Sequence, residues 1–169
     1  YLSDDGRRRD ASSALLSGDR ELQRIAVRYS DGTCVVANGH LRKRLKAVFG
    51  GRPVDLPPCG YCVWNERAGL EIESSDRFGF RVDYSASEEA IYLDTRQAKG
   101  DVALPKARGR GLAVCRREGK GWELVPVRGS VAFCVPGTRA RALDEAGADI
   151  GGAELVSAQD GFVSVKPVP

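Results

Sequence analysis

Two cysteines three positions apart, Cys59 and Cys62 in the run LPPCGYCVW, have the one spacing in the chain with a known chemical use. Two thiolates at this spacing can bind a tetrahedral metal ion such as Zn²⁺ from a tight turn. A redox dithiol would need a helix after Cys62, whereas VWNERAGLEIE predicts a strand. We expect a structural pair and no cofactor, with zinc binding as the alternative. The two further zinc ligands would come from the single residues Cys34, His40, Cys115 and Cys134.

Residues suited to catalysis are few. His40 is the only histidine, so any mechanism with an imidazole base depends on it. The segment KARGRGLAV contains Gly109 and Gly111 but not the G-x-x-x-x-G-K-[ST] pattern that binds phosphate. The carboxylates between Glu71 and Glu89 are typical of a solvated acidic face. The sequence therefore disfavours an enzyme.

Two segments resemble parts of the chymotrypsin-like serine proteases. GTCVVANGH, residues 32–40, is similar to the strand that carries their catalytic histidine, and GADIGGAELVSAQDGFVSV, residues 147–165, is similar to the segment that carries their nucleophile. Ile150 stands where the resemblance places the serine, Ala148 replaces a glycine, and Asp83 is the candidate acidic partner. Isoleucine cannot attack a carbonyl, so the resemblance implies at most a degenerate, inactive relative.

Basic residues form two groups that could bind an anionic partner. They are Arg42, Lys43, Arg44 and Lys46, and then Lys106, Arg108, Arg110, Arg116, Arg117 and Lys120. Trp122 and Tyr61 are candidate stacking platforms near these groups in the sequence. A β-barrel with a cationic face and exposed aromatic rings can bind single-stranded nucleic acid, because phosphates supply affinity and base faces supply stacking. The sequence pI of about 8.7 is lower than expected of a dedicated nucleic-acid module.

The formal net charge of +3 hides an uneven distribution. Residues 105–141 carry nine Lys and Arg against two Asp and Glu, whereas residues 61–104 carry five against nine. Such blocks either form a cationic surface for an acidic partner or face one another within the fold. The sequence leaves both interpretations open.

Short runs rich in Val, Ile, Tyr and Phe, separated by Gly and Pro, predict an all-β fold. The clearest hairpins are residues 22–39, which turn at Asp31-Gly32, and residues 153–167, which turn at Asp160-Gly161. We expect the first of these turns to be type I′. Further strands are predicted in residues 61–75, 78–85, 90–95 and 111–127. The expected architecture is a β-sandwich or partly open β-barrel built from consecutive hairpins, with one to three short helices.

Three segments have helical spacing. NGHLRKRLKAVFGG, residues 38–51, places Leu41, Leu45, Val48 and Phe49 on one stripe and its basic residues opposite, and Gly50-Gly51 would end it. Residues 10–18 and 139–147 are shorter candidates, the first capped by Asp10. Residues 1–9 predict a flexible charged arm, residues 10–166 one β-rich domain, and residues 167–169 the start of a linker or a terminal tail.

The odd number of cysteines and the lack of a leader-like segment favour a reducing, intracellular compartment and a soluble chain without a membrane partner. We expect a non-catalytic interaction or assembly module that binds another protein through a charged surface or a sheet edge. Single-stranded RNA binding through a basic face is the alternative, and an inactive protease relative is the second.

Overall fold

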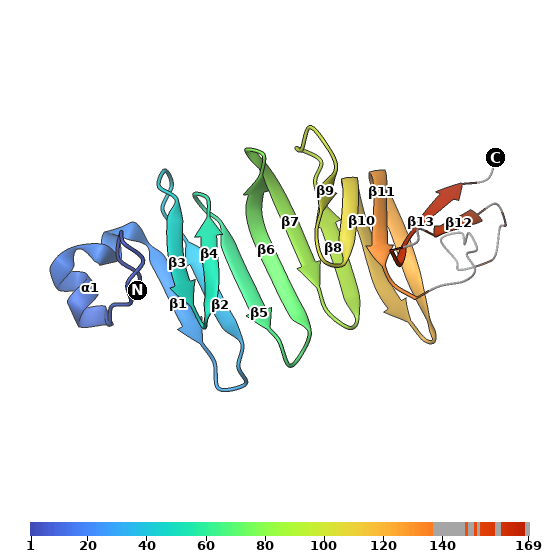
Figure 1. The fold of residues 1–169 in the computed structure, drawn as a ribbon. Helices are drawn as coiled ribbons and strands as arrows, with labels where there is room; N and C mark the ends of the chain where they lie inside the picture. Colours follow the sequence, from blue (N-terminus) through green and yellow to red (C-terminus); the bar gives the residue numbers. More distant parts are fainter. Residues whose placement is uncertain (137–147, 149–150, 152, 158–159, 168–169) are drawn as a thin grey trace. The chain divides into compact units, whose positions relative to one another are not determined.

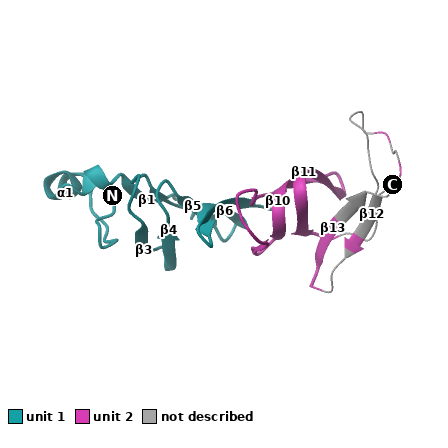
Figure 2. Cartoon of the chain, turned by 90° about the horizontal axis from the view of Figure 1, so that it is seen from above, with its two compact units in different colours: residues 1–88 teal, residues 89–169 magenta. Residues whose placement is uncertain are grey.

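A computed structural model describes residues 1–136, 148, 151, 153–157 and 160–167. Within these residues the chain is mostly β, with one α-helix and one short 3-10 helix (Figure 1). The prediction of an all-β fold is therefore confirmed. Contacts divide the chain into two compact units, residues 1–88 and 89–169, which are coloured separately in Figure 2.

Unit 1 begins with a folded segment and a helix. Residues 1–9, for which composition predicts a flexible arm, fold back on themselves through a bridge between Leu2 and Arg8. The Leu2 side chain is fully buried, so this one apolar residue holds its charged neighbours against the unit. Helix α1 (Ala11–Ser17) confirms the prediction at residues 10–18: Asp10 accepts a hydrogen bond from the Ser13 N–H, and Gly18 ends the helix with a φ of 75°. The 3-10 helix η1 (Asp19–Leu22) follows.

The sheet of unit 1 is antiparallel, in the order β1-β2-β5-β6-β7. These strands are β1 (Arg24–Arg28), β2 (Cys34–Asn38), β5 (Tyr61–Asn65), β6 (Leu70–Arg77) and β7 (Phe80–Ala86). The hairpin predicted at residues 22–39 is present, but its turn is not type I′. A type I′ turn needs positive φ at both central residues, and here only Gly32, with a φ of 93°, has one.

Residues 38–51 do not form the predicted helix. They lead into the hairpin of β3 (Leu45–Phe49) and β4 (Arg52–Leu56). Leu45 and Phe49 are buried whereas Lys46 and Val48 are exposed, so the apolar residues follow the two-residue period of a strand. Gly50-Gly51, with φ of 59° and 81°, does not stop a helix but makes the tight turn between the two strands.

The β3–β4 hairpin covers one face of the unit 1 sheet, which we call the covered face. The core between them contains Leu2, Cys34, Val36, Leu45, Phe49, Val54, Leu56, Cys62 and Trp64. Phe49 packs edge-on against Trp64 with 6.2 Å between ring centroids, and the Arg52 guanidinium lies over the Trp64 ring at 5.4 Å. Arg52 also pairs with Glu71 at 2.5 Å, which satisfies its charge at the margin of the core.

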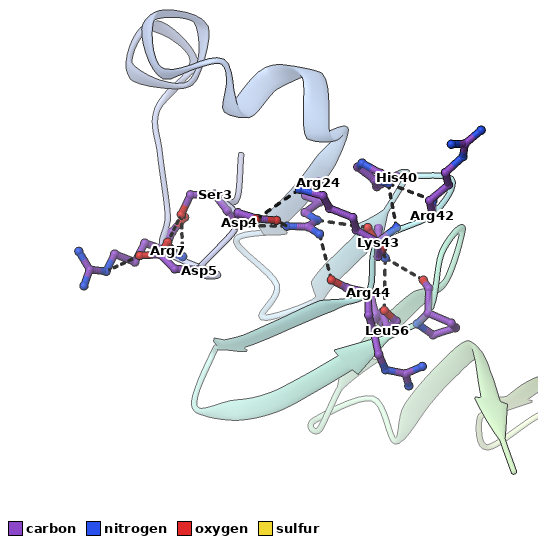
Figure 3. A network of polar contacts seen from close by, with 12 residues as sticks. Ser3, Asp4, Asp5, Arg7, Arg24, His40, Arg42, Lys43, Arg44 and Leu56 are labelled. Carbon is purple, nitrogen blue, oxygen red and sulfur yellow. Dashed lines mark hydrogen bonds and ion pairs between the residues drawn. The ribbon is translucent and has the colours of Figure 1, made fainter. Parts of the chain in front are cut away.

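A buried arginine joins the N-terminal segment to the sheet and the hairpin (Figure 3). The Arg24 side chain is almost completely buried, and its guanidinium donates to Asp4 Oδ1 at 2.9 Å and to the Arg44 carbonyl at 2.9 Å. Asn38, also buried, accepts from Arg24 Nε at 3.4 Å and donates to the carbonyls of Lys43 and Pro57 at 2.9 and 2.8 Å. These bonds fix the points where the hairpin leaves and rejoins the sheet.

Unit 2 has the strand order β8-β10-β11-β13-β12, with β9 also paired to β10. The strands are β8 (Ala90–Asp94), β9 (Val102–Ala103), β10 (Ala107–Glu118), β11 (Gly121–Cys134), β12 (Ala153–Ser157) and β13 (Phe162–Pro167). The hairpins predicted at residues 111–127 and 153–167 are both confirmed. The helix predicted at residues 139–147 and the last residues of the expected tail, 168–169, lie outside the described residues.

Both sheets are open. Among the described residues β1 pairs only with β2, and β12 only with β13, so neither strand closes a barrel. Of the described helices, none is long and apolar enough to cross a membrane.

Candidate functional site

The Cys59 and Cys62 thiols lie in different environments. Cys59 is exposed in a turn with a φ of 56°, whereas Cys62 is buried on the covered face of β5. Burial raises the pKa of Cys62 to about 11, which opposes the thiolate form that binds metal. In the part of the chain that the structure describes, no group of three or more His, Cys, Asp and Glu side chains could hold a metal ion. Among the described residues, the fold therefore brings no third ligand to this pair.

Thiol reactivity should follow this placement. At pH 8.5 we expect iodoacetamide to modify Cys59 and Cys134, which are exposed, at least tenfold faster than Cys62 and Cys115. Burial also raises the pKa of Cys115, to about 12, so both buried residues stay as unreactive thiols. Peptide mapping by mass spectrometry measures the rates, and urea-unfolded protein is the control in which all five cysteines should react. Equal rates for Cys59 and Cys62 in the native protein would contradict the placement.

His40 is a structural anchor of a loop. Its Nδ1 accepts hydrogen bonds from the N–H groups of Arg42 at 3.0 Å and Lys43 at 2.9 Å (Figure 3). In a serine protease the same nitrogen carries the proton and donates to an aspartate. Asp83, the candidate partner, accepts instead from the Ser74 hydroxyl. Ile150 lies outside the described residues, and the open sheets of both units differ from the closed barrels of those enzymes.

In the first basic group, three of the four side chains face carboxylates. Arg44 donates to Asp55 at 2.5 Å and to both oxygens of Asp76 at 3.0 and 2.7 Å. These bonds hold the pKa of Asp76 below its usual value and raise the pKa of Arg44. Lys46 lies 3.9 Å from Asp55, and Lys43 lies 3.4 Å from Asp4. Only Arg42 has no ion pair within the described residues, so little net positive charge remains on this group.

The second basic group belongs to unit 2 and follows strand β10. Side chains alternate across a strand, so Arg108, Arg110 and Arg116 share one face of the sheet and Arg117 lies on the other. Lys106 precedes the strand, and Lys120 lies in the turn before β11. The Arg108 guanidinium pairs with Asp160 and stacks on the Phe162 ring at 4.4 Å. Arg116 pairs with Glu123.

Sequence analysis missed one member of this surface, Arg128 of β11. The register places Arg128 opposite Leu112, and therefore on the same face as Arg110. The two-residue alternation along β10 predicts a shared face for Arg108, Arg110 and Arg116. The position of Arg128 follows only from the register of β11, which shifts at a β-bulge after Leu112, so no local signal in the sequence identifies it. We call Arg108, Arg110, Arg116 and Arg128 the arginine face of unit 2. Of the two candidate platforms, Trp122 is half-buried opposite Arg117, on the other side of this sheet.

Tyr61 belongs to an apolar surface of unit 1. Directly opposed residues of antiparallel strands point to the same side, so two rows of side chains cross β1, β2, β5 and β6 on the face away from the hairpin. The apolar residues of this open face are Ile25, Val27, Val35, Ala37, Tyr61, Val63 and Ile72. The Tyr61 row ends at Ser74 of β6, whose hydroxyl donates to Asp83 of β7. Ile25 is 45% exposed and Tyr61 43%, although the seven residues are all uncharged. An exposed apolar patch of this kind is typical of a contact site.

The open face ends at an unpaired strand edge. Tyr29 N–H donates to the Thr33 carbonyl and Gly39 N–H to the Gln23 carbonyl, so odd-numbered backbone groups of β1 point toward β2. Even-numbered groups point away, and one of them, the Arg24 carbonyl, accepts from Leu2 N–H at 3.0 Å. Within the described chain, nothing pairs with the outward N–H and C=O groups of Ala26 and Arg28. This edge can accept another strand.

Comparison of the chain with protein-family models, with curated proteins and with solved structures finds no match.

Proposed function

We propose that the protein is a non-catalytic binding module whose unit 1 accepts an extended segment of a partner protein as an additional strand beside β1. The observation that carries the proposal is the meeting of an unpaired strand edge and an exposed apolar surface at the same strand. Main-chain hydrogen bonds would supply affinity, and alternate side chains of the partner would supply specificity.

The partner segment follows from the chemistry of β1. Its backbone would pair with Ala26 and Arg28, and every second side chain would extend the apolar rows that begin at Ile25 and Val27. Arg28 is exposed at the end of the strand and favours an acidic residue at the matching position of the partner. We therefore expect an extended segment with alternating apolar residues and an acidic end.

A non-catalytic role agrees with the structural contacts of the residues that could act in catalysis. His40 accepts two backbone hydrogen bonds, Cys62 lies in the core, and Asp83 binds a neighbouring serine. Each of these groups is engaged in holding the fold together.

The test is selection of a displayed library of random ten-residue peptides on the immobilised protein, with affinities measured by fluorescence polarisation. Ala26→Pro removes one outward N–H and leaves the ladder to β2 intact, so it should weaken the selected peptides at least tenfold while the protein stays folded. Ile25→Ser with Val27→Ser should weaken them similarly by removing the apolar rows. The matched control, Leu41→Ser with Val48→Ser, changes two apolar side chains that are 76% and 69% exposed elsewhere in unit 1.

Enrichment of peptides with alternating apolar residues, with loss of binding in both edge variants and not in the control, would support the proposal. Selection of no peptide, or equal binding by Ala26→Pro and the wild-type protein, would overturn it. A dimer that Ala26→Pro dissociates would also overturn it, because the strand beside β1 would then be a second copy of this chain.

A further inference from the structure

Two arginines of unit 2 lie side by side and form no ion pair within the described residues. Arg110 of β10 faces Ser130, and Arg128 of β11 faces Leu112, so the two are diagonal neighbours on the arginine face. Both side chains are exposed, and neither forms an ion pair or a hydrogen bond within the described residues. Asp94 of β8, which faces Leu112 on the same side of the sheet, pairs with Arg96 at 2.7 Å. The other arginines of this face differ, since Arg108 is held by Asp160 and Arg116 by Glu123.

The backbone that carries these two arginines is brought together by glycines. A Cβ on Gly129 would overlap the Arg110 carbonyl oxygen, and a Cβ on Gly111 would overlap that of Arg128. From the other side, the buried Thr95 hydroxyl accepts from the Gly111 N–H at 2.8 Å. Strand positions that only glycine can occupy therefore fix the spacing of Arg110 and Arg128.

Within the described residues, neither guanidinium makes a polar contact that would stabilise the fold. Like charges on neighbouring positions of a sheet repel and reduce stability, and a polar uncharged residue would fit either exposed position. Between and beside the two guanidinium groups lie half-buried apolar side chains: Leu112, Val114 and Tyr92. Val125, which is 41% exposed, extends the same row on β11.

We infer that the arginine face binds single-stranded nucleic acid, with backbone phosphates on Arg110 and Arg128 and bases over the row of Tyr92, Val114 and Val125. Each guanidinium can donate two parallel hydrogen bonds to a phosphate, which an ammonium group cannot. An apolar and aromatic row beside the cations suits planar bases better than the charged side chains of an acidic peptide. The inference concerns a different unit from the proposed protein-binding edge.

The test measures binding of a fluorescent, mixed-sequence 15-nucleotide RNA between 50 and 200 mM salt. Arg110→Gln with Arg128→Gln should weaken binding at least tenfold and reduce the slope of log affinity against log salt by about 1.4, as expected for two lost phosphate contacts. The matched control, Arg117→Gln with Lys120→Gln, removes the same charge from the turn end of the same hairpin and should change affinity less than threefold. Ala26→Pro should leave RNA binding unchanged, which separates this inference from the proposed function.

Three results would overturn the inference. They are no RNA binding at 50 mM salt, equal weakening by the two double variants, and competition by polyglutamate as strong as that by unlabelled RNA. The second result would indicate attraction to net charge alone, and the third would identify an acidic protein segment as the ligand.

Discussion

Replacing Gly111 with alanine is expected to destabilise unit 2 by on the order of 3 kcal/mol or more. Gly111 has a φ of 151°, and an added Cβ would overlap the Arg128 carbonyl oxygen and lie 2.9 Å from its carbonyl carbon. These atoms are backbone and cannot rotate away, so β10 and β11 would have to separate. The loss of the ladder between them would also disturb the hydrogen bonds of Thr95. Urea unfolding followed by circular dichroism measures the change.

Gly119 provides the control for this substitution. It also has a positive φ, 56°, but nothing lies within 4 Å of the position of its Cβ. Gly119→Ala should therefore cost only about 1 kcal/mol, the usual price of a left-handed conformation. Equal losses of stability in the two variants would show that the positive φ, and not the close approach of the strands, is the reason for glycine at position 111.

Replacing Arg24 with alanine is expected to reduce the stability of unit 1 by on the order of 3 to 5 kcal/mol. The guanidinium is buried and satisfies Asn38 Oδ1 and the Arg44 carbonyl, so its removal leaves a cavity lined by unpaired polar groups. The N-terminal segment would lose its bond between Asp4 and Arg24 as well. Thermal unfolding monitored by the fluorescence of Trp64, which lies in the same core, reports the loss.

Arg28 is the matched control because it belongs to the same strand but is exposed. Arg28→Ala should change the free energy of unfolding by less than about 0.5 kcal/mol. If Arg24→Ala is as mild as Arg28→Ala, the buried network does not hold the hairpin to the sheet, and packing of Leu45 and Phe49 alone must do so.

The hairpins were predictable because local residues specify them. Asp31-Gly32 and the alternation around it place β1 and β2 correctly, and the turn near residues 118–121 does the same for β10 and β11. The helix prediction for residues 38–51 was wrong because Leu41, Leu45, Val48 and Phe49 fit the spacing of a helical stripe, although the segment forms a strand. Only the packing of Leu45 and Phe49 on the sheet decides between them.

The candidate surfaces were less predictable than the strands. Arg44 appears as one of four free cations in the sequence, but Asp55 and Asp76 reach it only after two hairpins have formed. Arg128 joins Arg110 through a strand register that depends on a β-bulge after Leu112. Burial of Arg24 likewise requires a carboxylate and a carbonyl from two distant segments. These contacts join segments that are far apart in the sequence. Composition and local patterns therefore do not predict them.

The β3–β4 hairpin is an insertion between two neighbouring strands of the meander. The chain leaves the sheet after Asn38 and returns at Gly60, whose carbonyl accepts from Asn38 N–H at 2.8 Å, so the insertion begins and ends at one point. Apolar side chains stand on both faces of β2 and β5, with Cys34, Val36, Cys62 and Trp64 on one face and Val35, Ala37, Tyr61 and Val63 on the other. The side on which the insertion folds decides which face is the interior. The inserted residues 39–59 therefore determine which face of this sheet stays uncovered, and with it the location of the proposed contact surface.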